Sequence, residues 1–332
     1  MSEPQSLPQR LCRWLSDGQF HSGTALAASC GVSRNAIWKA VAGLRALGLT
    51  VHAVANRGYR IPNASELLDA EQIVRLLPHD VAARLRSAQC VWRTSSTNAD
   101  LLERPAGPIG SFDFLTAECQ TEGRGRRKRS WFAPPCGAIC LSISWNFAAL
   151  PPDASALSLA VGVCVLRALH RVAVTGVTLK WPNDLVVNGD KLGGILIELR
   201  AEASGPAYVV IGIGMNVVLG DALHRQIEAT GTRAADLVGL GIQRADRNGI
   251  TAALIASTVA GLERYERDGF SSFAAEWRAA DALAGKAVVV SSEHGAVAGH
   301  ARGIDIDGAL CLQTRDGLQR FVTGDVSVRA AM

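Results

Sequence analysis

A basic, glycine-containing segment, Glu122–Trp131, carries the side chains best suited to chemistry on anions. It holds two glycines and five cations: Gly123, Gly125, Arg124, Arg126, Arg127, Lys128 and Arg129. Glycines let backbone amides approach a ligand closely, and guanidinium groups match carboxylates and phosphates. The segment therefore predicts a site where two anions meet and their repulsion is offset. The alternative is a solvated basic loop.

A lysine within an otherwise apolar strand is the second candidate. Apolar residues alternate along the strand that begins at Val177, which places Lys180 on the opposite face. A buried ammonium group needs an anionic partner, so a functional role is favoured over a lysine that reaches solvent. Pro182 and Asn183 end the strand, and Asn188-Gly189 predicts a hairpin that returns the chain as a second strand.

Polar residues suited to a neutral ligand follow a strand predicted near Cys90–Arg93. The turn Thr94–Asn98 is rich in hydroxyl groups. It is either the capped start of a helix or a set of directional hydrogen bonds inside an apolar pocket. A buried strand at Tyr208–Val218 contains two glycines, but the third glycine and the following helix of a dinucleotide fingerprint are missing. No Walker lysine motif occurs, so ATP, if used, binds in another kind of site.

Positive charge is concentrated at the amino-terminal end. The chain of 332 residues carries a net charge of +4. Residues 1–62 hold seven Arg or Lys against two acidic residues, a net +5, and the remainder sums to −1. A polyanionic partner is therefore expected at this end of the chain.

Three short helices and a β-hairpin are predicted within those residues, which is the outline of a winged helix-turn-helix. Ser33 is the predicted N-cap of the third helix, which would enter the major groove of DNA by its amino-terminal end. The predicted DNA contacts are Ser33, Arg34, Asn35 and Lys39. We expect Trp38 to be partly packed between this helix and the wing. A winged helix that binds protein is the alternative.

Composition is that of a globular chain, with 48% hydrophobic and 19% charged residues. The longest apolar stretch, Ala156–Leu166, is too short to span a bilayer, and no signal pattern begins the chain. We therefore expect no membrane contact and a cytoplasmic location. Eight scattered cysteines, with no second pair to complete a metal site at Cys136 and Cys140, are expected to be reduced thiols.

Three domains are predicted: a winged helix-turn-helix over 1–62, a catalytic domain over 63–283 and a small β domain over 284–332. Pro62-Asn63-Ala64-Ser65 is the predicted joint. The main elements expected in the central domain are strands at Phe112–Ala117 and Ala138–Trp145 and helices at Ala154–His170, Ile250–Arg267 and Ser271–Ala282. The short strands and turns of Gly285–Arg329 predict an SH3-like β-barrel.

Three motifs follow one another along the chain: Gly123–Arg127, Lys180–Asp184 and Lys191–Ile195. In that order they resemble the biotin protein ligase family, and the amino-terminal winged helix is similar to that of the bifunctional members, the biotin operon repressor type. The resemblance implies an α/β (α+β) catalytic domain of the biotin/lipoate ligase type between a winged helix-turn-helix and an SH3-like β-barrel. Two positions depart from the family pattern. Lys128 stands where the family often has glycine, and Ser95 where an acidic residue often precedes Ser-Thr-Asn.

The resemblance implies a two-step ligase reaction. The carboxylate of biotin attacks the α-phosphate of ATP, which is accompanied by Mg²⁺, to give biotinyl-5′-AMP and pyrophosphate. A lysine of the carboxyl-carrier protein of a biotin-dependent carboxylase then takes the acyl group. Arg124, Arg126 and Lys180, the expected catalytic residues, can offset the like charges that meet at phosphorus. Operator DNA and a homodimer in the adenylate-bound state are also implied.

The resemblance assigns further residues. The expected biotin contacts are Ser96, Thr97, Asn98, Gln120, Arg124, Gly125, Arg126, Lys180 and Gly194. The expected adenylate or ATP contacts are Arg126, Arg127, Trp131, Asn183, Asn216 and Arg329. No side chain is expected to bind a metal directly. Two alternatives remain open: a lipoate or other acyl protein ligase, and a non-catalytic repressor that keeps the pocket only as a biotin sensor.

Overall fold

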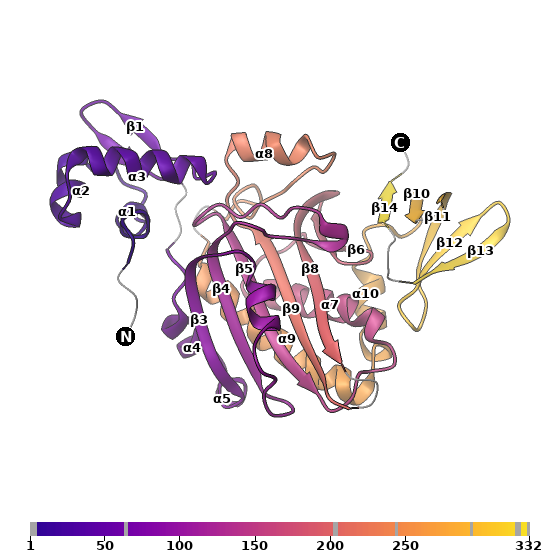
Figure 1. Ribbon diagram of the computed structural model, residues 1–332. Coiled ribbons are helices and arrows are strands. Elements are labelled where there is room, and N and C mark those ends of the chain that lie inside the picture. The colour runs from indigo at the N-terminus through magenta and orange to yellow at the C-terminus, as the bar shows by residue number, and fades with distance from the viewer. Residues whose placement is uncertain are drawn as a thin grey trace.

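The computed structural model describes residues 5–62, 66–201, 205–242, 245–292, 295–322 and 327–330. Figure 1 shows a small helical part at the amino-terminal end, a large central sheet with helices, and a second sheet at the carboxyl-terminal end. Most of the predicted joint, residues 63–65, lies outside the described residues.

The amino-terminal part has the predicted helices and hairpin. Its elements are α1 (Leu7–Leu15), α2 (Gly23–Cys30), α3 (Arg34–Ala46), β1 (His52–Val54) and β2 (Gly58–Arg60). Leu11, Ile37 and Val41 point inward at helical spacing and are buried. Gly31 ends α2 in the left-handed region, and the Ser33 hydroxyl accepts a hydrogen bond from the Ala36 amide at 3.2 Å to begin α3. The predicted helix-turn-helix and wing are therefore present.

The central sheet has seven strands in the order β3-β4-β5-β9-β8-β7-β6. Their bounds are β3 (Leu85–Thr94), β4 (Phe112–Gln120), β5 (Ala138–Phe147), β6 (Thr178–Lys180), β7 (Asp184–Val187), β8 (Asp190–Ala201) and β9 (Ala207–Asn216). Only the β3–β4 pair is parallel among these pairings. The hairpin predicted at Asn188-Gly189 joins β7 to β8, and both of its residues have positive φ.

Helices cover one face of this sheet. These are α4 (Ala70–Leu76), α5 (His79–Ala82), α7 (Leu157–Arg171), α9 (Arg247–Asp268) and α10 (Ser271–Ala279). With a short 3₁₀ turn, Ala154–Ala156, before it, α7 completes an apolar segment, Ala154–Arg171, that is long enough by length and composition to cross a membrane. This finding corrects the prediction from the sequence that the longest apolar stretch is too short to span a bilayer. In the fold, 67% of this segment is buried, which is typical of a helix in the core of a domain.

The opposite face carries α6 (Thr97–Leu102), and α8 (Asp221–Glu228) lies beyond the end of β9 (Figure 1). Sequence periodicity missed both α5 and α8, which have four and eight residues. The carboxyl-terminal part is a five-stranded antiparallel sheet, consistent with the predicted SH3-like barrel. Its strands are β10 (Ala287–Ser292), β11 (Gly295–Ile304), β12 (Leu310–Thr314), β13 (Gly317–Phe321) and β14 (Ser327–Ala330).

Candidate active site

One row of residues across the central sheet places the predicted lysine on the face that the large helices leave free. Lys180 lies opposite Asp184, Asp184 opposite Gly194, and Gly194 opposite Gly214. Directly paired residues of antiparallel strands project to the same face. The neighbouring Leu179 is buried in the core beneath. Alternation along β6 therefore places Lys180 on the face opposite the core, as the sequence predicted, and the strand register places Gly194 on that same face.

Glycines of β9 make room for the groups that lie on this face. A side chain at Gly214 would meet the ring of Trp131 at 2.7 Å, and one at Gly212 would run into the Asn98 amide. The two glycines that fail as a dinucleotide fingerprint therefore have a packing role. Because they have no side chains, Trp131 of the basic segment and Asn98 of α6 can pack directly against the sheet.

The hydroxyl-rich turn forms a buried polar network at the start of α6. The Ser96 hydroxyl caps the helix, accepting from the Ala99 amide at 3.4 Å. The Thr97 amide donates to Gln120 Oε1 at 2.8 Å, and Ser142 Oγ lies 2.7 Å from Thr97 Oγ1. The turn is thus the capped start of a helix, which confirms the first alternative, and its polar groups also form a buried network; ligand binding by that network stays a prediction.

Glu198, on β8, joins the basic segment to that network. Its carboxylate lies 3.2 Å from the Arg124 guanidinium and accepts from Asn98 Nδ2 at 2.9 Å. Sequence reasoning missed both Glu198 and Ser142. For Glu198 a signal existed, because alternation along Gly194–Glu198 places it on the face of Gly194.

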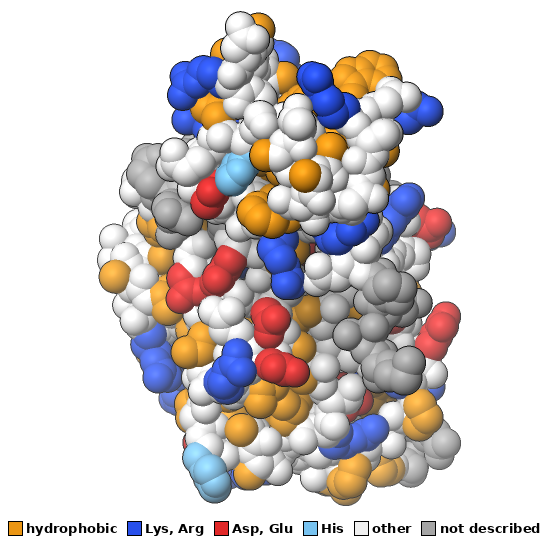
Figure 2. Space-filling model, turned by 90° about the vertical axis from the view of Figure 1, so that its left-hand side faces the viewer, with side chains coloured by type: hydrophobic (Ala, Val, Ile, Leu, Met, Phe, Trp, Pro, Cys, Tyr) orange, Lys and Arg blue, Asp and Glu red, His pale blue; other side chains and the backbone are white. Residues whose placement is uncertain are grey.

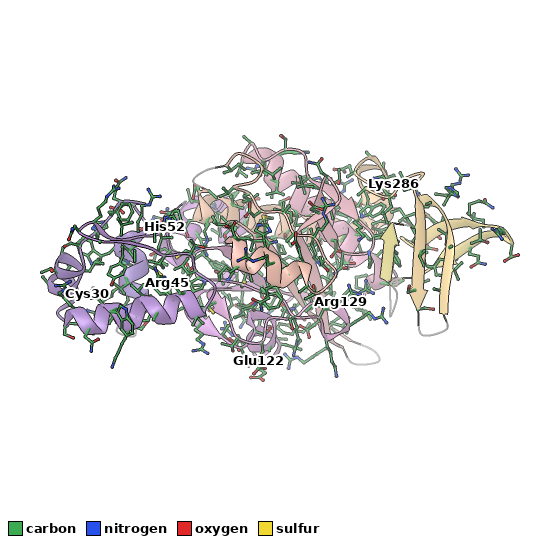
Figure 3. The ribbon with its side chains drawn as sticks, turned by 90° about the horizontal axis from the view of Figure 1, so that it is seen from above. Cys30, Arg45, His52, Glu122, Arg129 and Lys286 are labelled. Atoms are coloured by element: carbon green, nitrogen blue, oxygen red, sulfur yellow. The ribbon has the colours of Figure 1, made fainter. Side chains whose placement is uncertain are left out.

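The basic segment closes on itself. The Gly125 amide donates to the Arg129 carbonyl at 2.8 Å, and the Trp131 amide to the Gly123 carbonyl at 2.7 Å. A 3₁₀ turn spans Arg126–Lys128, and Lys128 has φ 56°. This left-handed backbone explains why glycine suits that position. Viewed from above, the segment lies between the amino-terminal part and the carboxyl-terminal sheet (Figure 3).

Two predicted nucleotide contacts bind backbone in the structure. Asn183 Nδ2 donates to the Ile195 carbonyl at 2.6 Å, and Asn216 Nδ2 to the Ala235 carbonyl at 3.0 Å. Both side chains therefore hold the strand ends together beside the row of Lys180. The side chain of Arg329 lies outside the described residues, although its backbone belongs to β14.

A buried ion pair, also missed from the sequence, supports the sheet beneath the site. Arg247 of α9 is fully buried and lies 2.9 Å from Glu118 of β4. Glu118 also accepts from the Cys136 amide at 3.0 Å, and Arg247 donates to the Ala138 carbonyl at 2.8 Å. Burial lowers the pKa of Arg247, but Glu118 and the neighbouring thiols of Cys136 and Cys140 together outweigh it, and the pKa lies above its ordinary value. The pair ties α9 to the chain that leads out of the basic segment.

Cysteines near the site are packing residues. Burial raises the pKa of the Cys140 thiol, beneath Trp131, to about 12. All eight cysteines are free of disulfides, as expected. Within the described residues no cluster of three or more His, Cys, Asp or Glu side chains can hold a metal ion.

The exposed side of α3 forms the second candidate site. Arg34, Asn35 and Lys39 are exposed there, while the Ser33 side chain serves as the cap. Trp38 is 60% exposed. The expectation that Trp38 packs between helix and wing is therefore wrong. Figure 2 shows Lys and Arg side chains over this part of the molecule, with acidic side chains mostly below it.

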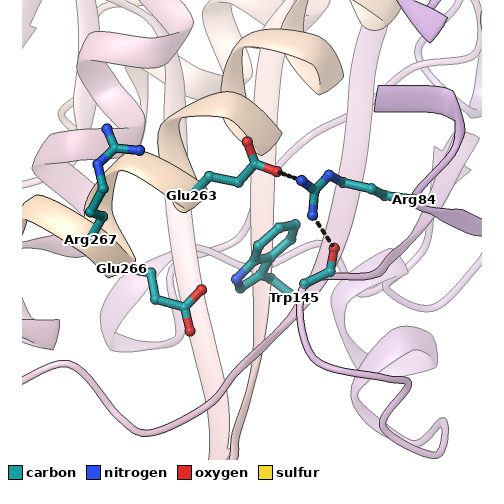
Figure 4. A pocket seen from close by; sticks show the side chains of 6 residues that line it. Arg84, Trp145, Glu263, Glu266 and Arg267 are labelled. Atoms are coloured by element: carbon teal, nitrogen blue, oxygen red, sulfur yellow. Dashed lines mark hydrogen bonds and ion pairs between the residues drawn. The ribbon is translucent and has the colours of Figure 1, made fainter. Parts of the chain in front are cut away.

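A surface pocket of about 360 Å³ is lined by Arg84, Trp145 and Glu263, among others (Figure 4). Trp145 lies further along the sheet than the row that contains Lys180. Three of the pocket's four charged side chains are in ion pairs: Arg84 and Glu263 pair with each other at 2.7 Å, and Arg267 pairs with Asp268, outside the pocket, at 2.9 Å. No predicted site residue lines it. It is not a continuation of the candidate active site.

Comparison with known families agrees with these three parts. An HTH domain model matches residues 9–60, the Biotin/lipoate A/B protein ligase family model residues 92–216, and the Biotin protein ligase C terminal domain model residues 284–329. A solved biotin protein ligase from Aquifex aeolicus, in complex with biotin and ATP, superposes with a TM-score of 0.61 at 24% identity. The match covers 75% of this chain and 99% of that one, which shows a shared fold.

Relatives match most or nearly all of the chain. The chain is 35% identical over 333 residues to the bifunctional ligase/repressor BirA of Salmonella typhimurium, covering 98% of both chains. It is 34% identical to the Escherichia coli BirA, again over 98% of both. A biotin–[acetyl-CoA-carboxylase] ligase of Mycobacterium tuberculosis is 38% identical over 73% of this chain and 88% of its own. The chain therefore belongs to the biotin protein ligase family, among the members that carry a helix-turn-helix domain before the ligase core.

Proposed function

We propose that this protein is an ATP-dependent biotin protein ligase that forms biotinyl-5′-AMP and transfers biotin to a lysine of a carboxyl-carrier protein. One observation carries the proposal. A single sheet face holds Lys180, Gly214 with Trp131 packed against it, and the polar network of Thr97, Asn98 and Gln120. The end-to-end identity to ligase/repressors supports it.

In this proposal the polar network binds the ring of biotin and the cations meet its carboxylate. The attack of a carboxylate on a polyphosphate brings like charges together, and Lys180, Arg124 and Arg126 offset them. Because these groups stand on a strand and a closed loop, they need little reorganisation during the reaction. Ser96, Gly125 and Gly194 complete the predicted biotin side.

The adenylate side is assigned to Arg126, Arg127 and Trp131, with Asn183 and Asn216 holding the backbone around it. Arg329, whose backbone belongs to β14, is assigned to the same side. Mg²⁺ would enter with the phosphates of ATP, whose oxygens it prefers as ligands. It would reduce their negative charge and help the pyrophosphate leave.

The test supplies the purified protein with ATP, Mg²⁺ and either biotin or lipoate, and measures pyrophosphate. The expected result is pyrophosphate release with biotin, and transfer of labelled biotin to a carrier domain when one is added. Release with lipoate alone would identify a lipoate ligase. Biotin binding without pyrophosphate from either acid would identify a non-catalytic sensor.

A second function, biotin-responsive repression, is favoured by the exposed cations of α3 and the net charge of +5 on residues 1–62. Arg34 and Lys39 are placed to contact phosphates or bases of operator DNA, with Asn35 between them. We propose that the adenylate-bound protein pairs as a homodimer in the cytoplasm, which would set two copies of α3 on the half-sites of a palindrome.

A further inference from the structure

We propose that Glu198 is a positioning residue that sets the donor and acceptor pattern of the biotin-ring pocket. Through Asn98 and Ser142 it leaves the Thr97 hydroxyl able to accept a hydrogen bond from a ligand N–H. The inference rests on the proposed ligase function and extends it to a residue outside the family motifs.

The first step concerns the two oxygens of Glu198. One lies 3.2 Å from the Arg124 guanidinium and the other accepts from Asn98 Nδ2 at 2.9 Å. A carboxylate paired with a guanidinium only accepts hydrogen bonds. It therefore holds the nitrogen of the Asn98 amide toward itself, with a longer contact to the Leu196 carbonyl at 3.4 Å on the same side, and the amide oxygen turns the other way. That oxygen lies 2.6 Å from Ser142 Oγ.

The second step is a count of protons. Three close oxygen–oxygen contacts follow one another: Ser142 to Asn98 at 2.6 Å, Ser142 to Thr97 at 2.7 Å, and Thr97 to Gln120 at 3.1 Å. Only two hydroxyl protons are available for them, because both amide oxygens are acceptors. The two shorter contacts, at 2.6 and 2.7 Å, are typical O–H···O distances, so each must have a proton between its oxygens. Ser142 therefore donates to Asn98, and Thr97 donates to Ser142.

The third step gives the resulting pattern. With its proton committed, Thr97 Oγ1 presents lone pairs to the pocket. Gln120 keeps its oxygen on the Thr97 amide at 2.8 Å and so presents its amide nitrogen as a donor. An acceptor next to a donor matches a ring with an N–H beside a carbonyl, such as the ureido ring of biotin. A ring without an N–H, such as that of lipoate, would leave buried polar groups unpaired, which is a strong basis for rejection.

The experiment measures biotin binding without ATP, by calorimetry, in a double-mutant cycle of Glu198→Gln and Thr97→Val. A glutamine can present either a donor or an acceptor to Asn98. Only the longer contact to the Leu196 carbonyl, at 3.4 Å, then still favours the original direction of the proton chain. We expect each single variant to bind biotin about tenfold more weakly. The double variant should be no more than about threefold worse than either, because both changes remove the same interaction.

Three further variants sharpen the cycle. Glu198→Asp keeps a group that only accepts and should bind within about threefold of wild type. Ser142→Ala breaks the chain in the middle and should match Thr97→Val; it stands in for Glu198→Gln if that variant does not fold. Glu263→Gln is the matched control, since Glu263 also pairs with an arginine, at 2.7 Å, but at the far end of the sheet. It should bind biotin as wild type does.

Wild-type affinity in Glu198→Gln, or independent losses that multiply in the double variant, would overturn the role of Glu198 alone. Failure of the wild-type protein to bind biotin at all would instead overturn the proposed function, and this inference with it.

Discussion

Lys180 reaches the site through strand alternation alone. Leu179 enters the core on one face of β6, so Lys180 must project to the other, where Asp184, Gly194 and Gly214 lie in register with it. A residue in this position lies on the sheet face against which Trp131 of the basic segment packs, without being part of that segment. This geometry gives the lysine a role that can be tested separately from folding.

Replacing Lys180 with alanine is expected to reduce adenylate formation by about 100-fold or more, because a positive charge is lost where negative charge develops. The measurement is pyrophosphate release with biotin and saturating ATP. The melting temperature should stay near that of wild type, since the side chain is only partly buried. Pyrophosphate release at the wild-type rate would remove Lys180 from the catalytic set.

Arg126 is expected to act later, by retaining the product of the first step. The Arg126→Gly variant should release labelled biotinyl-AMP at least about tenfold faster, because a charge-assisted contact with its phosphate is lost. Dissociation is followed after dilution into unlabelled adenylate. Lys286→Gly, an exposed cation on the carboxyl-terminal part (Figure 3), is the control. Equal dissociation rates for Arg126→Gly and wild type would contradict this role.

Individual residues of the site could be predicted from the sequence where a local rule applied. The residues that they contact could not. Alternation identified Lys180, and cap preference identified Ser33. Glu198 lies 74 residues from Arg124, and Arg247 lies 129 residues from Glu118, so no local pattern joins either pair. Such contacts exist only once the sheet order is known.

Among the elements, long periodic helices and alternating strands were predicted well because each has a repeating apolar face. The short helix α8 was missed because only Leu223 of its eight residues is buried. The strand β3 was underestimated because its residues are mostly half-buried at a sheet edge. The exposure of Trp38 could not be inferred from helical spacing, since that depends on where the wing lies.

Helix α9 is held to the sheet by a charge that has no access to water. Truncating Arg247 to alanine leaves Glu118 buried without its cation, which is expected to lower the free energy of unfolding by about 3–5 kcal/mol. Urea unfolding monitored by circular dichroism measures the change. Arg267→Ala, which removes an exposed cation of the same helix, should change stability little. A small loss for Arg247→Ala would show that the ion pair does not secure α9.

Helix α3 is expected to contact DNA through both a cation and an aromatic side chain. Arg34→Ala and Trp38→Ala should each weaken binding to the protein's own biotin-gene promoter. Only Arg34→Ala should reduce the slope of log affinity against log salt, by about one unit, because only it removes a phosphate contact. Titrations at several salt concentrations separate the two effects. Unchanged affinity in both variants would argue for a winged helix that binds protein.

At the scale of the whole molecule, the amino-terminal part packs directly on the chain that leaves the basic segment. Cys136 belongs to the same buried cluster as Leu11, Cys12 and Ile37. A side chain at Gly48, just after α3, would lie 3.5 Å from Pro134. Residues 131–137 therefore contact Gly214 of the sheet through Trp131 at one end and the amino-terminal part through Pro134 and Cys136 at the other.

This contact predicts that filling the central site changes DNA affinity, provided the adenylate favours one of two states of the protein. Wild-type protein with biotin and ATP should bind its biotin-gene promoter about tenfold or more tightly than protein alone. The Lys180→Ala variant should show no increase with biotin and ATP, because it makes little adenylate. It should regain the increase when biotinyl-AMP is added ready-made, since the loop and the interface at Cys136 and Gly48 are intact. If promoter affinity is unchanged by biotin and ATP and also by added biotinyl-AMP, the coupling is contradicted. The helix-turn-helix would then act independently of the active site.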